Sequence, residues 1–287
     1  MHEVPYEQKR RAGGHVTVAP DNSQLPTSKV QGGLGVGSWD SGVDRVQVPA
    51  GVARLGTTHD EAPFAWDNER DAHEVFVPAF TVDTHNVTNG QFMAFVEAGG
   101  YTDARWWRLE DWAWVIGAGI AHPRFWVEED GRWYWRGMFA RVPLPSSWPV
   151  YVTWAEAKAY ASWRGARLLT EPEFHRAAQG STAGNCDFER WDPEPVGSRP
   201  ETSSAFGVHD LVGNGWEWTS TVFAPFAGFS PLPSYPEYSA DFFDGEHFVM
   251  KGASPATPRE LVRPGFRNWF RPRYPYAYAG FRCVSDE

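Results

Sequence analysis

An unusual number of tryptophans, together with many glycines and prolines, constrains this chain more than any other feature. Its 287 residues include 16 tryptophans, 28 glycines and 23 prolines. Glycine and proline interrupt regular helices and strands, whereas large aromatic side chains gain most when they are buried against other side chains. The composition therefore predicts a fold with many irregular loops that pack on an aromatic core.

Charge and cysteine content exclude several classes of protein. The chain has 26 basic and 36 acidic residues, a formal net charge of −10, which argues against partners such as nucleic acids and anionic membranes. It lacks a run of 18 apolar residues, and residues 1–14 lack the apolar centre of a secretory signal. The two cysteines, Cys186 and Cys283, cannot form a disulfide scaffold, so we expect a cytoplasmic protein.

Two regions differ in sequence pattern. Residues 1–45 are polar, rich in glycine and without periodicity, and are predicted to form a flexible N-terminal tail. Residues 46–287 are predicted to form one folded domain. Its first part should contain short β-strands at Val46–Gly51, Ala53–Gly56 and His73–Asp83, where apolar and polar residues alternate between turn residues.

Helix starts are marked by threonines. The segments Thr88–Gln91 and Thr170–Glu173 match the capping box, in which a threonine precedes a glutamine or glutamate by three residues. Thr153 is expected to cap a further helix over Trp154–Trp163, where alternate alanines favour helix formation. Three helices are therefore predicted between residues 88 and 178.

The remaining segments are predicted to be irregular. Residues 101–148 contain eight tryptophans and should form an excursion with one short hairpin near Phe125–Trp135. Beyond Ala178 the pattern favours short strands and loops without a helix. The order of these elements predicts an α+β fold with little regular secondary structure.

One segment resembles a known family signature. Gly213-Asn214-Gly215-Trp216-Glu217-Trp218-Thr219 is similar to the GNxWEWT motif of the formylglycine-generating enzyme (sulfatase-modifying factor) superfamily. Further segments resemble that family in the same order: Pro49–Gly51 with Leu55–Gly56, His73–Val75, Val87–Phe92, Pro149–Ala157, Arg167–Phe174 and Gly280–Cys283. The resemblance covers most of the chain and implies the family's loop-rich α+β fold, which is related to C-type lectins.

The resemblance also implies a structural calcium ion (Ca2+) near Asn214 and Glu217. Both side chains offer the oxygen atoms that calcium prefers, although calcium needs six to eight oxygens. A packing role is the alternative, with Trp216 and Trp218 in the core and Glu217 bonded to backbone amides.

Formylglycine-generating enzymes oxidise a substrate cysteine with copper and a reactive cysteine pair. That pair should lie shortly before the closing Gly280–Cys283 segment, but the corresponding stretch, Phe266–Pro275, contains no cysteine. Because this chemistry requires a thiolate, the sequence argues against that activity. Cys283 is expected to be a small apolar core residue.

A second branch fits the same stretch better. Arg267-Asn268-Trp269 resembles the sulfoxide synthases of ergothioneine and ovothiol biosynthesis (EgtB-like), as do Phe64–Glu69, Pro225–Phe229 and Tyr235–Ser239. The resemblance implies the substrate-binding domain of a non-haem iron oxidoreductase that uses O2 to form a C–S bond on trimethylhistidine, or a C–Se bond as in selenoneine biosynthesis.

The same resemblance assigns roles to particular residues. Asn268 and Trp269 would hold trimethylhistidine, Tyr238 would line the pocket, and Tyr235 would be the catalytic proton donor. Aromatic faces bind quaternary ammonium groups, and a phenol can supply a proton. The alternative is that these aromatic residues only extend the core.

The donor of sulfur or selenium is uncertain. The branch that uses γ-glutamylcysteine has an aspartate directly after Asn-Trp and an arginine four residues later, whereas this chain has Phe270 and Tyr274. The thiol or selenol donor is therefore left open, and a selenium sugar is one alternative. Arg271 and Arg273 either bind an anionic donor or are solvated charges.

The resemblance places iron outside this chain. The synthases bind Fe(II) through three histidines of a separate N-terminal DinB-like bundle, but the nine histidines here form no HxxxH pair, and His59-Asp60-Glu61 is an isolated HxE match. We therefore expect no iron ligands in this chain and Fe(II) from a DinB-like partner domain or chain; the sequence is otherwise a fragment of a longer protein, or the protein no longer catalyses. The alternative function is a non-catalytic, lectin-like binding or interaction module of the same superfamily.

Overall fold

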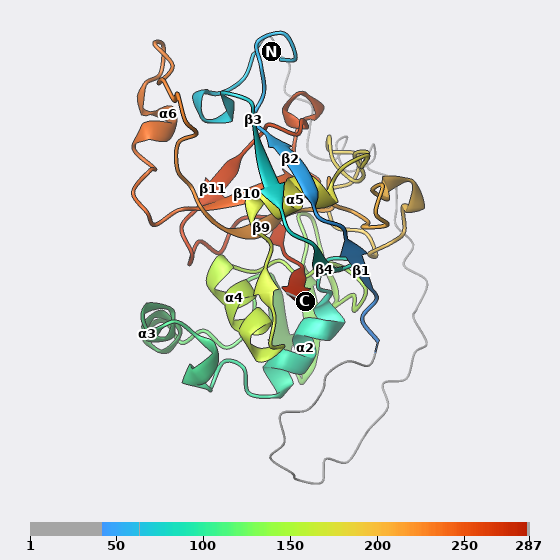
Figure 1. Cartoon of the computed structure of the whole chain (residues 1–287). Helices are drawn as coiled ribbons and strands as arrows, with labels where there is room; N and C mark the ends of the chain where they lie inside the picture. The colour runs from blue at the N-terminus through green and yellow to red at the C-terminus, as the bar shows by residue number, and fades with distance from the viewer. Residues whose placement is uncertain (1–41, 63, 286–287) are drawn as a thin grey trace, which may run out of the picture. The chain divides into compact units, whose positions relative to one another are not determined.

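The computed structural model describes residues 42–62 and 64–285 (Figure 1). Most of the predicted tail, residues 1–45, lies outside the described residues. The described residues form five α-helices and thirteen short strands, and none of the strands exceeds eight residues. This confirms the predicted α+β class with little regular structure. In this part of the chain, no helix has the length and apolar character needed to cross a membrane.

The two ends of the described chain meet in one antiparallel sheet. Its strand order is β1 (Arg45–Val48), β4 (Phe80–Asp83), β13 (Cys283–Ser285) and β8 (Arg167–Leu168). The last strand, β13, lies between β4 and β8, so the C-terminal segment completes the sheet that the first strand begins.

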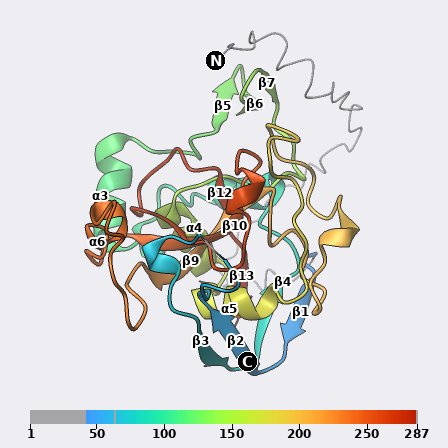
Figure 2. The ribbon, with the colours of Figure 1, turned by 90° about the horizontal axis from the view of Figure 1, so that it is seen from above.

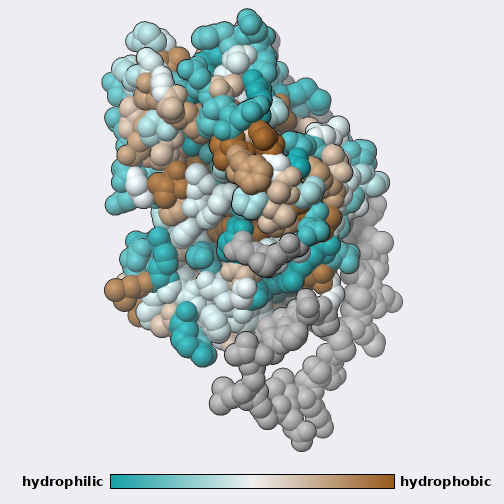
Figure 3. Space-filling model, viewed as in Figure 1, coloured by the Kyte–Doolittle hydropathy of each residue, from teal (hydrophilic) through white to brown (hydrophobic). Residues whose placement is uncertain are grey.

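A two-stranded sheet forms from β2 (Gly51–Leu55) and β3 (His73–Val77). The prediction of one strand over residues 73–83 was wrong, because the chain leaves extended pairing at Pro78 and resumes in β4. Proline has no N–H to donate to a sheet. Val52 and Phe76 are partners on the exposed face of this sheet, where Figure 3 shows apolar residues at the surface.

A second four-stranded sheet contains the signature segment and the Asn-Trp segment. Its order is β11 (Asn268–Phe270), β10 (Phe248–Ala253), β9 (Gly215–Val222) and β12 (Ala279–Gly280). β12 runs parallel to β9 and the other pairs are antiparallel.

The tryptophan-rich excursion contains more regular structure than the sequence predicted. The predicted hairpin is confirmed by β5 (Trp126–Glu129) and β6 (Arg132–Arg136), and β7 (Arg141–Pro143) extends it to the three-stranded sheet seen at the edge of Figure 2. The prediction of irregular structure missed α3 (Leu109–Ala118). This helix exposes Leu109 and has no capping side chain, so neither of the usual signals marked it.

The three helices predicted from threonine caps are confirmed. They are α2 (Asn89–Glu97), α4 (Trp154–Trp163) and α5 (Glu171–Ala177), and each cap accepts a hydrogen bond from the third helical N–H. The prediction of no helix after Ala178 was wrong, because α6 (Glu237–Ala240) forms a single turn. So short a helix has no periodicity that a sequence pattern could reveal.

The predicted aromatic core is confirmed. Phe92 of α2 stacks on Tyr160 of α4 with ring centroids 5.2 Å apart, and Trp126, Trp135 and Trp218 are buried around them. The indole N–H of Trp126 donates to the Asn89 side chain at 2.9 Å. Aromatic packing therefore joins helices, strands and loops in the first of two buried hydrophobic clusters, and the second lies around Val48, Phe80 and Leu169.

Candidate functional site

Trp269 is the centre of an aromatic cluster at the edge strand β11. The ring of Phe223 stacks on one face of its indole, with centroids 4.2 Å apart and planes 6° from parallel. Tyr238 approaches edge-on at 5.4 Å, and Phe242 lies tilted at 5.6 Å. Trp269 itself is only partly buried. The cluster is therefore an aromatic wall with part of the indole accessible.

A third segment completes this wall. Trp66 stacks on Tyr238 with centroids 3.9 Å apart, directly before the 3-10 turn η1 (Asp67–Glu69). The hydroxyl of Ser239 in α6 accepts from the Asn68 amide at 2.9 Å and donates to Asp67. The structure thus brings segment 64–69 to segment 235–239, both of which resemble the synthases in sequence. The sequence pattern indicates the segment around Trp66 but assigns Trp66 itself no role.

Tyr235 lies at the outer end of the cluster. Its ring centroid is 5.7 Å from that of Tyr238, and 53% of the residue is exposed. The pKa of the Tyr238 phenol is raised well above its usual range, first by burial and then by the carboxylates of Glu69 and Asp67. Tyr238 is therefore protonated at neutral pH, and Tyr235 is the phenol that a ligand can reach from solvent.

Polar atoms next to the cluster are left without protein partners. Trp66 Nε1, Asp67 Oδ2 and Asn68 Oδ1 are buried and have no hydrogen-bond partner among the described residues. The Asn268 side chain accepts a hydrogen bond from the Trp269 N–H at 2.9 Å through Oδ1. Such atoms provide donors and acceptors for a ligand or for water.

Arg267 has a structural role. Its guanidinium donates to the two Glu171 carboxylate oxygens, through Nε at 3.0 Å and through Nη2 at 3.1 Å, and both side chains are buried. It also donates to the Asn68 carbonyl oxygen at 3.2 Å and lies 4.1 Å from the ring centroid of Phe226. Arg267 therefore connects η1, α5 and β11, and holds the segments that make up the site.

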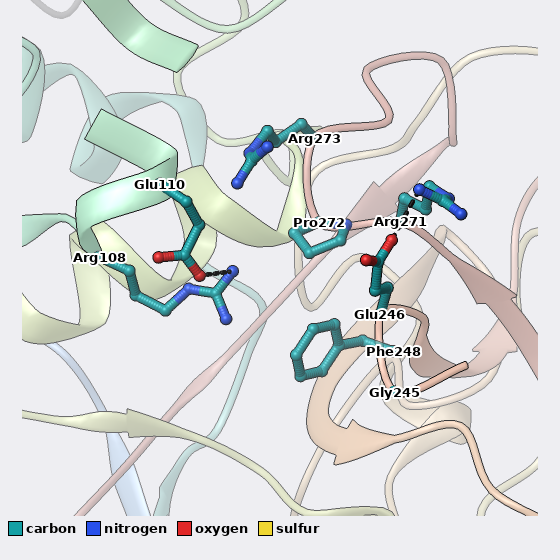
Figure 4. Close-up of a pocket in the computed structure, with 8 residues that line it drawn as sticks. All are labelled: Arg108, Glu110, Gly245, Glu246, Phe248, Arg271, Pro272 and Arg273. Atoms are coloured by element: carbon teal, nitrogen blue, oxygen red, sulfur yellow. Dashed lines mark ion pairs between the residues drawn. The ribbon is translucent and has the colours of Figure 1, made fainter. Parts of the chain in front are cut away.

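The residues after Trp269 contact groups outside the cluster. Phe270 stacks on Tyr274 with centroids 4.2 Å apart. Arg271 is exposed and pairs with Asp244 at 3.3 Å and Glu246 at 2.7 Å. Arg273 donates through Nε to Asp111 at 2.9 Å. Both arginines thus have protein partners, and both line a pocket of about 310 Å³ (Figure 4).

Iron ligands are not gathered in the described part of the chain. Residues 42–62 and 64–285 contain no group of three histidine, cysteine or acidic side chains arranged to hold a metal ion. His59 is exposed, and its neighbour Glu61 is bonded to Arg54 at 2.7 Å. Among the described residues, this HxE match is therefore not part of a cluster that could hold iron.

The signature glutamate forms a buried ion pair. Glu217 accepts from Arg282 Nε at 2.8 Å, whereas the packing role predicts bonds to backbone amides. Trp216 and Trp218 are buried, as that role requires. Asn214 accepts from the Glu194 N–H at 2.8 Å through Oδ1. The calcium site stays a prediction, in which calcium would share these oxygens with their protein partners.

Both cysteines occupy buried positions. Cys186 and Cys283 are both free and buried, and burial raises the pKa of the Cys283 thiol far above its usual range. A thiol held in its neutral form is a poor nucleophile. The structure therefore gives Cys283 the packing role that the sequence indicated.

The profile of the sulfatase-modifying factor enzyme 1-like domain matches residues 38–287. The chain belongs to this family, which confirms the predicted formylglycine-generating-enzyme fold. It is 38% identical over 256 residues to hercynine oxygenase of Mycolicibacterium thermoresistibile and 39% identical over 252 residues to that of Mycobacterium tuberculosis. Each alignment covers 81% of this chain but only 56% and 58% of the relative.

A solved structure supports the fold. PvdO from Pseudomonas aeruginosa aligns with 85% of this chain and 94% of its own, with a TM-score of 0.55 and 23% identity. Together with the family profile, this likeness supports the predicted fold.

Proposed function

We propose that this chain is the substrate-binding part of a C–S or C–Se bond-forming synthase of ergothioneine or selenoneine type, and that it binds trimethylhistidine. The observation that supports this most directly is the convergence of Trp66, Tyr238 and Trp269 from three distant segments. The similarity to hercynine oxygenases supports the same ligand, because hercynine is the trimethylated betaine of histidine.

The cluster offers chemistry that suits this betaine. A quaternary ammonium group is attracted to the faces of tryptophan and tyrosine. The carboxylate of the ligand would accept from the amide Nδ2 of Asn268. Tyr235, exposed beside Tyr238, would supply a proton during oxygen activation. In this proposal the phenol of Tyr238 lines the pocket and stays protonated.

Fe(II) and the O2 chemistry are assigned to a DinB-like iron-binding domain or chain. The family resemblance supports this division, and the described residues themselves offer no iron site. The donor in this proposal is a thiol or selenol other than γ-glutamylcysteine, since Phe270 and Tyr274 offer its amine and carboxylate no charged partners. We also propose a cytoplasmic location, where the two buried cysteines would remain reduced.

Calorimetry on Trp269→Ala tests the proposal. Loss of the indole should weaken trimethylhistidine binding by about 0.5–2 kcal/mol, the usual value of a cation–π contact. Trp106→Ala is a matched control, because Trp106 is also partly buried and lies under an arginine, Arg105, at 5.2 Å. Equal affinity in the wild type and Trp269→Ala would overturn the assignment.

A non-catalytic binding module is the second candidate. The lack of an iron-ligand cluster in the described residues favours it. Mixing the chain with a DinB-like iron protein distinguishes the two candidates. A binding module would bind trimethylhistidine or another ligand without turnover, whereas the substrate-binding part of a synthase would restore product formation.

A further inference from the structure

The pocket of about 310 Å³ beside the aromatic cluster has charged walls. Arg108 and Glu110 at the start of α3 form one wall, and Glu246, Arg271 and Arg273 form the others, with Phe248 between them (Figure 4). Arg271 follows Trp269 by only two residues. The segment from α6 to β10 contributes to both sites, with Tyr238 and Phe242 in the cluster and Glu246 in the pocket.

One buried carboxylate orients two of these arginines. Asp111 is 1% exposed, and its two oxygens accept from Arg108 Nε at 2.7 Å and from Arg273 Nε at 2.9 Å. The guanidinium of Arg108 also lies 4.8 Å from the ring centroid of Trp154. Nη2 of Arg108 pairs with Glu110 at 3.0 Å and lies 3.4 Å from the second Asp111 oxygen. Nη1 of Arg108 and both Nη atoms of Arg273 have no hydrogen-bond or ion-pair partner among the described residues. These nitrogens form a pre-oriented pair of donors for a carboxylate.

The pocket also offers negative charge. Glu246 pairs with Arg271 at 2.7 Å, and both side chains are more than half exposed. Exposed ion pairs contribute little and rearrange readily. Because three guanidinium groups and two carboxylates line the same space, the pocket suits a ligand that has one negative and one positive group close together.

We propose that this pocket binds the α-amino-acid head group of the sulfur or selenium donor. The carboxylate of the donor binds Arg108 and Arg273, its ammonium group binds Glu246, and Asp111 positions the two arginines. The identification of the ligand as the donor rests on the proposed function, whereas recognition of a zwitterion rests on the pocket alone.

Binding of L-cysteine to the purified full chain, in the presence of a reductant, tests this proposal by calorimetry. The comparison ligands are 3-mercaptopropionate, which lacks the ammonium group, cysteamine, which lacks the carboxylate, and the neutral 1-thioglucose. L-Cysteine should bind at least about tenfold more tightly than each, since hydrogen bonds to charged groups are the strong ones. No measurable binding of L-cysteine at millimolar concentration, or tighter binding of the thiosugar, would overturn it.

Two variants test which pocket side chains contact L-cysteine. Arg273→Gln should weaken L-cysteine binding about tenfold, and Glu246→Gln should weaken L-cysteine but leave 3-mercaptopropionate unchanged. Arg105→Gln is the control, because Arg105 is exposed and lies outside the pocket. Unfolding midpoints verify that each variant folds. If neither pocket variant alters L-cysteine binding, the pocket is not the site.

Trimethylhistidine binding, measured on the same samples, separates this inference from the proposed function. It should be unchanged in Arg273→Gln and Glu246→Gln. If trimethylhistidine fails to bind while L-cysteine binding depends on Arg273, the proposed function is wrong and the zwitterion pocket remains. If trimethylhistidine binds and L-cysteine does not, the proposed function remains and the head-group site is wrong.

Discussion

The rings of Phe270 and Tyr274 stack face to face, with centroids 4.2 Å apart and planes 5° from parallel. By the family resemblance, the branch that uses γ-glutamylcysteine would have an aspartate and an arginine at these two positions. In this chain the two replacements contact each other, so an aromatic pair occupies the place of a charged pair.

Reversing this pair should change donor preference. The double variant Phe270→Asp with Tyr274→Arg should bind γ-glutamylcysteine at least about tenfold more tightly than the wild type, because each restored charged hydrogen bond contributes about 1.5–3 kcal/mol. Competition binding against L-cysteine measures this. The variant Phe270→Leu with Tyr274→Leu controls for loss of the stack. Tight binding of γ-glutamylcysteine by the wild type would show that the two positions are misassigned.

The buried pair of Glu217 and Arg282 should dominate local stability. Arg282 also donates to the carbonyl oxygens of Thr84 and His209, so it joins β9 to two loops. Glu217→Gln should lower the free energy of unfolding by about 3–5 kcal/mol, as expected when a buried charge loses its partner. Urea denaturation measures this, with Asp103→Asn at an exposed pair as the control that should change little. A small effect at Glu217 would mean that water replaces the pair.

Acid should destabilise the protein through two histidines whose pKa is lowered in the folded chain. Burial lowers the pKa of His175 well below its usual 6.5, and the pKa of His85 is also lowered, first by burial and then by Arg282. Below about pH 6.5 the unfolded chain takes up these protons and the folded chain does not. Stability is therefore complete above this pH and falls as the pH drops toward the folded pKa, by at most about 1.4 kcal/mol per pH unit and proton.

Unfolding free energies measured between neutral and mildly acidic pH test this direction. His175→Asn should reduce the slope, whereas His59→Asn, at an exposed position, should retain it. An unchanged slope in His175→Asn would show that the unfolding transition does not report on this imidazole.

The isolated chain should not bind iron tightly. Imidazole and carboxylate ligands must converge on one centre, and the described residues contain no such group. Anaerobic Fe(II) titration followed by elemental analysis measures the stoichiometry, with and without a DinB-like partner. Stoichiometric iron in the isolated chain would contradict this prediction, and His59→Ala would then be the first variant to examine.

Local features of the sequence predicted local structure well. The segments that begin at Thr88, Thr153 and Thr170 start helices where their caps indicated, because a cap involves only the few residues that follow it. Strand pairing was not predictable in the same way. The neighbouring strands β1 and β2 do not pair with each other but with β4 and β3, since side-chain alternation defines the faces of a strand and not its partner.

The candidate site, too, was predictable from the sequence only in its local features. The aromatic core, the capped helices and the family signature follow from the amino-acid order alone, because composition, short-range hydrogen bonding and local motifs are written along the chain. The stacking of Trp66 on Tyr238, and the orientation of Arg108 and Arg273 by Asp111, required the folded chain. Such contacts join segments as much as 199 residues apart, as in the hydrogen bond from Arg267 to the Asn68 carbonyl oxygen. Long-range packing selects them from many combinations that are equally compatible with local pattern.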